Sequence, residues 1–143
     1  LGDALGAQLL PWAQATAGVF SVIGHNWSIF LKFGGGAGTG PNVGWSAAIW
    51  LWVLPIAFLV MGGMLYFVGM ASVASLSMAV VTIIVFAYRY LTGIDPTAAY
   101  LVGSVVAGLV ITWALRPNIR RVMNGTERLV GPRAKRRAQQ EVK

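Results

Sequence analysis

The sequence predicts an all-α, polytopic helical membrane protein, and its composition and charge spacing support this fold class. Of the 143 residues, 57% are apolar and 10% are charged, whereas about a quarter of the residues in an ordinary soluble domain are charged. The charged residues leave long gaps at 4–31, 33–88 and 96–115. Each gap can hold the roughly 20 apolar residues that cross the hydrocarbon core, and the middle gap has room for about two or three helices. The alternative, a buried core subunit of a large soluble complex, fits this distribution less well.

The first predicted span covers residues 6–24 of a transmembrane domain that extends over residues 1–115. Pro11 suits the first turn of a helix, where its missing N–H is not needed. Trp27 and Lys32 follow at a predicted membrane interface, because aromatic and basic side chains anchor there. A glycine-rich loop at 34–40 then separates this span from the next apolar block.

The second apolar block, residues 44–71, is too short for two full spans of about 20 residues each. Gly62 and Gly63 interrupt it, so we expect two short helices, 44–61 and 63–71, that form a hairpin. Non-helical backbone at membrane depth must be covered by protein. We therefore expect other helices to shield the hairpin.

The last two predicted spans cover residues 76–91 and 97–115. The stretch "ASVASLS" before them contains three hydroxyl side chains and breaks the apolar pattern. In the final span, small residues recur four positions apart, which allows close helix packing. They are Gly103 and Ala107, and Ser104 and Gly108.

The C-terminal region is strongly basic. Residues 116–143 hold nine of the eleven Lys and Arg residues and two of the four acids, so the whole net charge of +7 lies there. Residues 116–130 are predicted to form an amphipathic helix on the membrane surface. Its apolar face would contain Ile119, Val122, Met123 and Val130. Residues 131–143 are predicted to be a disordered basic tail. Basic residues beside a span mark the cytoplasmic side, so anionic lipid headgroups are a simpler partner than nucleic acid.

Few side chains in this sequence are suited to chemistry. There is no Cys and only one His, so neither a metal centre nor a cofactor is expected. The glycine loop lacks the Walker pattern and is either an anion-binding nest of backbone amides or a flexible interfacial turn. His25 is either a structural hydrogen-bonding group or a ligand for a metal or pigment. Ser72, Ser75 and Ser77 either bind a phosphate or bond within their helix.

Three stretches resemble conserved motifs of the bacterial acyl-phosphate:glycerol-3-phosphate acyltransferases, the PlsY family. Residues 22–40 are similar to G-H-x-x-x-x-F followed by F-x-G-G-K-G-V-A-T. Residues 69–77 are similar to R-Y-x-S-L-x-S, and residues 115–128 are similar to H-R-x-N-I-x-R-x-x-x-G-x-E. The resemblance implies a PlsY-like helical bundle in the bacterial inner membrane, with the C-terminus in the cytoplasm. The family's S-G-N-x-G-x-x-N motif is absent, and we expect natural sequence upstream of Leu1.

The resemblance also implies an activity and a set of site residues. Enzymes of the family transfer an acyl group from acyl phosphate to glycerol 3-phosphate at the cytoplasmic face. His25 would be structural, and no cofactor is implied. The residues that would bind phosphate or substrate are Gly35, Gly36, Gly38, Ser72, Ser75, Asn118, Arg121 and Glu127.

Three positions depart from the family pattern: Ala37 replaces a Lys, Gly69 an Arg and Leu115 a His. If each lost hydrogen bond to a charged group is worth about 1.5–3 kcal/mol, the total loss is about 4–9 kcal/mol, or roughly a thousand- to a million-fold in rate. We therefore predict a pseudoenzyme that serves as a structural or lipid-binding subunit and contacts other membrane subunits through its helices. The alternative is an active glycerol-3-phosphate acyltransferase of phospholipid synthesis.

Overall fold

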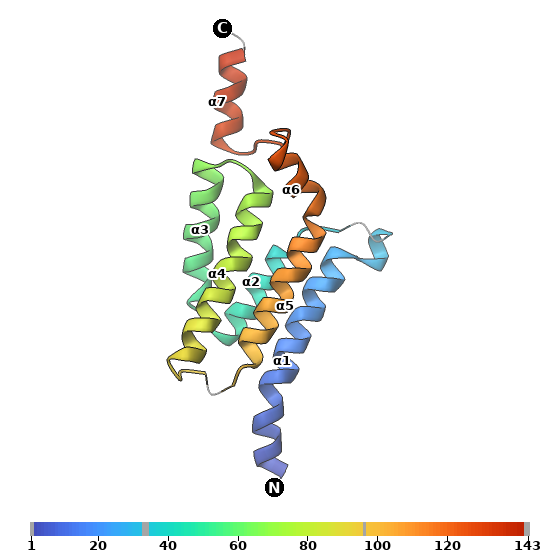
Figure 1. Cartoon of the computed structure of the whole chain (residues 1–143), viewed down its shortest axis with the longest axis vertical. Helices are drawn as coiled ribbons and strands as arrows, with labels where there is room; N and C mark the ends of the chain where they lie inside the picture. Colours follow the sequence, from blue (N-terminus) through green and yellow to red (C-terminus); the bar gives the residue numbers. More distant parts are fainter. Residues whose placement is uncertain (1, 33–34, 96, 142–143) are drawn as a thin grey trace.

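The computed structural model describes residues 2–32, 35–95 and 97–141, which fold into a bundle of helices (Figure 1). Within these residues there is no strand, and the all-α prediction is confirmed. Leu1, Gly34 of the predicted loop and residues 142–143 of the predicted tail lie outside the described residues. The elements are α1 (Gly2–Asn26), the 3-10 helix η1 (Ile29–Leu31), α2 (Thr39–Ile49), α3 (Val53–Phe67), α4 (Ala71–Leu91), α5 (Ala99–Ala114), α6 (Arg116–Met123) and α7 (Pro132–Glu141).

Successive helices run in opposite directions, so alternate connections lie at the same end of the bundle. In Figure 1 the chain rises through α1, descends and rises through α2 and α3, then descends and rises through α4 and α5. The glycine loop, the connection between α3 and α4, and helix α6 therefore lie at the same end, which we call the loop end. The connections between α2 and α3 and between α4 and α5 lie at the opposite end.

The outer surface of the bundle is apolar, as expected for helices that face lipid. Phe58, Leu59 and Leu91 are 79%, 77% and 80% exposed. Helix α4 is long and apolar enough to span a membrane by itself. Helices α5 and α6 are long and apolar enough to span a membrane when taken together, and their axes are bent by 63° relative to each other.

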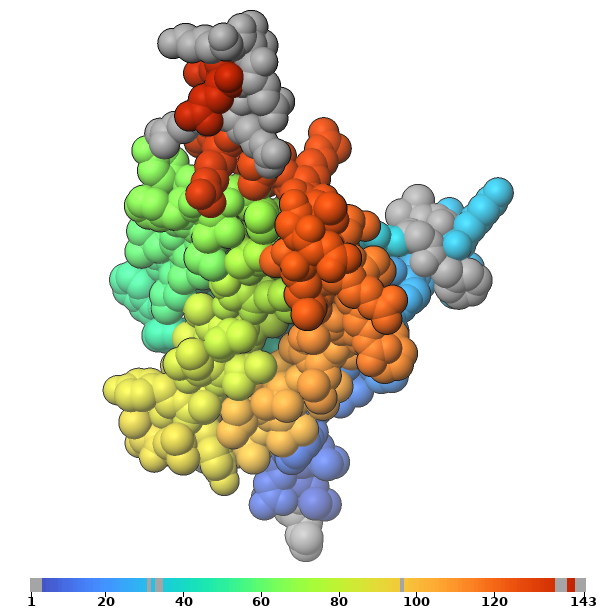
Figure 2. All heavy atoms as spheres, turned by 45° about the horizontal axis from the view of Figure 1, so that its top comes forward, coloured from blue at the N-terminus to red at the C-terminus, as the bar shows by residue number. Residues whose placement is uncertain are grey.

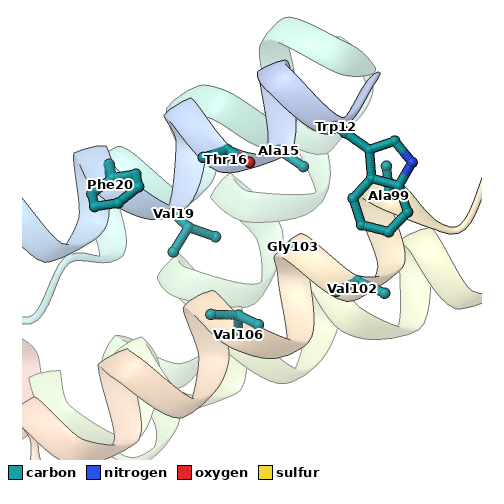
Figure 3. A pocket seen from close by; sticks show the side chains of 9 residues that line it. All are labelled: Trp12, Ala15, Thr16, Val19, Phe20, Ala99, Val102, Gly103 and Val106. Carbon is teal, nitrogen blue, oxygen red and sulfur yellow. The ribbon is translucent and has the colours of Figure 1, made fainter. Parts of the chain in front are cut away.

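Small residues bring α1 and α5 close together in the core. Four small residues on α5 are buried: Gly103, Ser104, Ala107 and Gly108. Small residues four positions apart allow a neighbouring helix to approach closely. A Cβ atom added at Gly103 would lie 2.9 Å from the Cβ of Ala15 on α1. Further out, the two helices leave an apolar cavity of about 180 Å³ between Trp12, Val19 and Val106 (Figure 3).

The position predicted for the hairpin break was wrong. The block from 44 to 71 does contain two short helices, but the break lies between Ile49 and Val53. Pro55 is the third residue of α3, where its missing N–H leaves no intrahelical bond unmade. Gly62 and Gly63 instead lie inside α3, and no atom comes within 4 Å of a Cβ added at either position.

The stretch "ASVASLS" does not break a helix, because it forms the first two turns of α4. The hydroxyl groups of Ser75 and Ser77 donate hydrogen bonds to the carbonyl oxygens of Ala71 and Val73, at 2.9 Å each. These bonds stay within the helix and satisfy the hydroxyl groups without ending it. The span predicted at 76–91 therefore begins at Ala71.

The C-terminal predictions also need correction. The helix predicted over 116–130 ends at Met123, and Gly125 has a left-handed φ of 68°. Residues 124–131 lead back across the loop end, and residues 132–141 form helix α7 rather than a disordered tail. The apolar face expected on one long helix is consequently split, since Val130 lies outside α6 and its backbone N–H donates to the carbonyl oxygen of Gly69.

The close approach of α1 and α5 gives a testable prediction. The substitution Gly103→Ala should destabilise the bundle by about 1–3 kcal/mol, because the added methyl group overpacks the contact with Ala15. The matched variant Gly62→Ala adds the same group to an uncrowded helix position and should be neutral or stabilising by up to about 1 kcal/mol. Thermal unfolding of both variants in detergent measures the difference. Equal stability of Gly103→Ala and the parent chain would contradict the close packing.

Candidate functional site

A polar cavity of about 280 Å³ lies at the loop end of the bundle. Its walls come from the glycine loop, the first turns of α4 and the junction of α5 with α6. The three stretches that carry the family resemblance therefore meet around one cavity, although they are far apart in the sequence. The lining residues are Gly35, Gly36, Ala37, Ala71, Ser72, Ser75, Ala114, Leu115 and Asn118.

The glycine loop packs tightly across the C-terminal end of α1. A Cβ atom added at Gly35 would collide with the backbone carbonyl oxygens of His25 and Asn26, and one added at Gly36 would lie 2.5 Å from Nε2 of His25. Gly38 caps the start of α2 with a left-handed φ of 72°. Because only glycine tolerates this crowding and this backbone conformation, the glycines set the course of the loop.

Glu127 connects two walls of the cavity. Its Oε1 atom accepts hydrogen bonds from the hydroxyl group of Ser72 at 2.7 Å and from Nδ2 of Asn118 at 3.0 Å. Its Oε2 atom accepts a bond from Nε of Arg121 at 2.9 Å. The Glu127 side chain is only 5% exposed. One buried carboxylate thus ties the first turn of α4 to helix α6.

These contacts lower the pKa of Glu127. The hydrogen bond from Asn118 has the largest effect, followed by the bond from Ser72, and Arg121 adds to both. Burial acts in the opposite direction and raises the pKa, but the hydrogen bonds outweigh it. Glu127 is therefore ionised near neutral pH and acts as a fixed acceptor that holds Ser72 and Asn118 in place.

The structure brings most of the predicted site residues together. Gly35, Gly36, Ser72, Ser75 and Asn118 line the cavity, and Arg121 and Glu127 contact this lining through hydrogen bonds. Gly38 does not line the cavity. It is buried beneath the loop, beside Val22 and Asn26 of α1.

His25 and the three positions that differ from the family pattern lie at or near the loop end. His25 lies in the last turn of α1 with an exposed side chain. Ala37 packs against the hydrophobic core, and Leu115 is 6% exposed within it. Gly69 is buried at the connection between α3 and α4, with a left-handed φ of 72°. The described lining of the cavity therefore contains no charged side chain.

Sequence reasoning did not select Asn26, which the structure places under the loop. Its side chain is 4% exposed, and neither its oxygen nor its nitrogen has a hydrogen-bond partner among the described residues. The sequence feature that could have identified Asn26 is a polar residue in the last turn of an apolar helix. Among the described residues, no three His, Cys, Asp or Glu side chains gather where a metal could bind.

An apolar bundle with a polar cavity at one end defines the chain as an integral membrane protein. Comparison with known proteins then shows that it belongs to the glycerol-3-phosphate acyltransferase family, whose model matches residues 3–125. The chain is 38% identical over 121 residues to a glycerol-3-phosphate acyltransferase of Aromatoleum aromaticum, covering 85% of this chain and 59% of the relative. It is 34% identical over 134 residues to that of Rubrobacter xylanophilus, covering 94% and 64%.

Two solved structures are also similar. Both are crystal structures of PlsY (YgiH), described as an integral membrane glycerol 3-phosphate acyltransferase. The glycerol 3-phosphate form has a TM-score of 0.72 at 28% identity and covers 84% of this chain and 57% of that one. The lysophosphatidic acid form has a TM-score of 0.71. The chain thus spans about three fifths of the length of the proteins it matches.

The prediction of a non-catalytic structural subunit was wrong. Relatives that are 34–38% identical carry the name glycerol-3-phosphate acyltransferase, and the fold matches that of PlsY. These findings favour an enzyme. The prediction had added the losses at Ala37, Gly69 and Leu115 and had counted Lys32 as the single spare cation near the loop. The structure shows that the C-terminal segment returns to the loop end, where Arg133 donates a hydrogen bond to the carbonyl oxygen of Val68.

The hydrogen bonds of Glu127 predict a pH-dependent contribution to stability. Because the folded-state pKa lies below the ordinary value of 4.5, these bonds stabilise the fold above that value and are lost as the pH falls through the folded-state pKa. Glu127→Gln should therefore destabilise the protein by about 1.5–3 kcal/mol at neutral pH. The difference should shrink as the pH falls below 4.5 and through the folded-state pKa.

Thermal unfolding of the parent and of Glu127→Gln across this pH range measures the effect. Arg128→Gln is a suitable control, because it removes the charge of an exposed neighbouring side chain. A stability difference for Glu127→Gln that stays constant with pH would contradict the assignment of an ionised, hydrogen-bonded Glu127.

Proposed function

We propose that this chain forms the substrate site of a glycerol-3-phosphate acyltransferase that acts in phospholipid synthesis. The observation that carries the proposal is the cavity at the loop end, where Gly35, Ser72 and Asn118 meet from three separate stretches. The names and structures of the relatives support the same reaction.

The chemistry proposed for this cavity is acyl transfer from acyl phosphate. The hydroxyl oxygen of glycerol 3-phosphate attacks the acyl carbonyl carbon and forms an ester bond. The bond from that carbon to the phosphate oxygen breaks, and inorganic phosphate leaves with the electron pair and takes up the hydroxyl proton. The products are lysophosphatidic acid and phosphate.

The residues of the cavity suit the binding of these phosphorylated molecules. Backbone amides of a glycine-rich loop can hold a phosphate or stabilise a developing oxyanion, and crowding at Gly35 and Gly36 keeps this loop close to α1. Glu127 fixes the positions of Ser72 and Asn118. In this proposal Ser72 and Asn118 contact the substrate, and Glu127 acts as a positioning residue.

The proposed location is the bacterial inner membrane, with the loop end and the C-terminus at the cytoplasmic face. The basic residues of 116–143 support this orientation, because Lys and Arg near the end of a span favour the cytoplasmic side. The same charges favour contact with anionic lipid headgroups.

The proposal predicts that the purified protein makes lysophosphatidic acid from acyl phosphate and glycerol 3-phosphate. Gly35→Ala should reduce the rate by about 100-fold or more, because displacement of the loop misplaces the groups that hold the reactants. Mass spectrometry of the extracted lipid product measures both rates.

The matched control is Gly40→Ala, where no atom lies within 4 Å of the added Cβ. This variant should keep a rate within about threefold of the parent, since the loop can retain its path. Absence of product from the parent protein would overturn the proposed function. Equal rates for Gly35→Ala and Gly40→Ala would overturn the role assigned to the loop.

A further inference from the structure

The cavity at the loop end lacks positive charge of its own. Its described lining is made of glycine, alanine, leucine, serine and asparagine residues. The nearest carboxylate, Glu127, adds negative charge beside Ser72 and Asn118, and one arginine, Arg121, pairs with it. A phosphate ester carries close to two negative charges at neutral pH. The described cavity walls supply no cation that would match this charge.

The segment after α6 returns to the loop end, where hydrogen bonds hold it in place. The backbone N–H of Val130 donates a 2.7 Å hydrogen bond to the carbonyl oxygen of Gly69. Glu127, three residues earlier, bonds to Ser72 in the first turn of α4. Figure 2 shows this C-terminal segment lying against the loop end of α3 and α4. Hydrogen bonds therefore hold this segment at two places, the cavity and the connection between α3 and α4.

Arg133 is the basic residue that this return brings to the connection. Its Nη1 atom donates to the carbonyl oxygen of Val68 at 3.1 Å. A Cβ atom added at Gly69 would lie 2.8 Å from the Cβ of Arg133, so the absence of a side chain at Gly69 makes room for the arginine. Ala71, two residues further along, lines the cavity. Arg133 thus packs against Gly69, two residues before the cavity-lining Ala71.

The guanidinium group of Arg133 can still bind an anion in this position. Arginine has five N–H donors in a planar fork, and one of them makes the bond to Val68 in the described structure. The side chain is exposed, and a planar arginine fork suits the oxygens of a phosphate. The bond to Val68 holds the group at the connection while other donors can reach a ligand.

We propose that Arg133 is the cation that binds the phosphate of the substrate, delivered from α7 to a cavity whose own walls carry no charge. The inference rests on the proposed function for the identity of the substrate. The phosphate is that of glycerol 3-phosphate or of the acyl donor. A lipid phosphate presents the same chemistry, so the experiment separates these sources.

The test compares Arg133→Gln with Arg133→Lys and Lys135→Gln. Glutamine removes the charge and keeps a polar side chain, whereas lysine keeps the charge. Lys135 is exposed on the same helix, and its substitution removes an equal charge from the tail. Steady-state assays with each phosphorylated substrate varied in turn give KM and kcat in neutral detergent and in nanodiscs with and without phosphatidylglycerol. Calorimetry with glycerol 3-phosphate alone and with acyl phosphate alone measures binding without turnover.

The expected result is a KM for one phosphorylated substrate that rises about 10- to 100-fold in Arg133→Gln, the range for loss of a charge-assisted hydrogen bond. Arg133→Lys should restore KM to within a few-fold, and Lys135→Gln should leave it unchanged. An unchanged KM for both substrates in Arg133→Gln would overturn the proposal, as would an effect seen only with phosphatidylglycerol present. If no variant shows turnover, loss of glycerol 3-phosphate or acyl phosphate binding in Arg133→Gln still supports this inference, whereas the proposed function fails. Retained binding of both glycerol 3-phosphate and acyl phosphate in that case overturns both.

Discussion

The structure of the loop end depends on the buried carboxylate of Glu127. Its two oxygens accept hydrogen bonds from Ser72 on α4 and from Asn118 and Arg121 on α6. Glu127 itself follows α6, so these bonds close the turn at Gly125 and direct the chain back over α3 and α4. If the carboxylate were removed, two cavity walls would lose their shared acceptor. Helix α7 would also lose the anchor that precedes it.

The second constraint is the apolar surface of the bundle. Helices that face lipid cannot carry charge at low cost, and the described part of the chain places its charges mainly at the two ends. At the end opposite the cavity, Arg89 pairs with Asp95 at 2.8 Å and stacks over Trp50. At the loop end, the carboxylate and the arginines come from the segment after α5. The charged side chains described at the loop end after α5 therefore come from sequence that follows the spans, whereas Ala37 and Leu115 in the cavity wall are apolar.

The sequence was sufficient to predict the helical class, the close packing at Gly103 and the three stretches that meet around the cavity. It could not locate the break in the hairpin, because Gly62 and Gly63 resemble a break and only the structure shows that they face open space. It could not predict the return of α7, since the hydrogen bonds from Val130 to Gly69 and from Arg133 to Val68 join residues about sixty positions apart. The functional prediction relied on the three positions that depart from the family pattern, and the similarity to glycerol-3-phosphate acyltransferases overturned it.

The central claim is that the cavity at the loop end binds the phosphate of glycerol 3-phosphate. Hydrogen–deuterium exchange of the purified protein, with and without glycerol 3-phosphate, tests it most directly because it reports on backbone amides near the ligand. The account predicts slower exchange in peptides that contain Gly35 and Gly36 and in those that contain residues 126–133. Unchanged exchange at both places, with protection confined to the end of the bundle near Arg89 and Asp95, would contradict it.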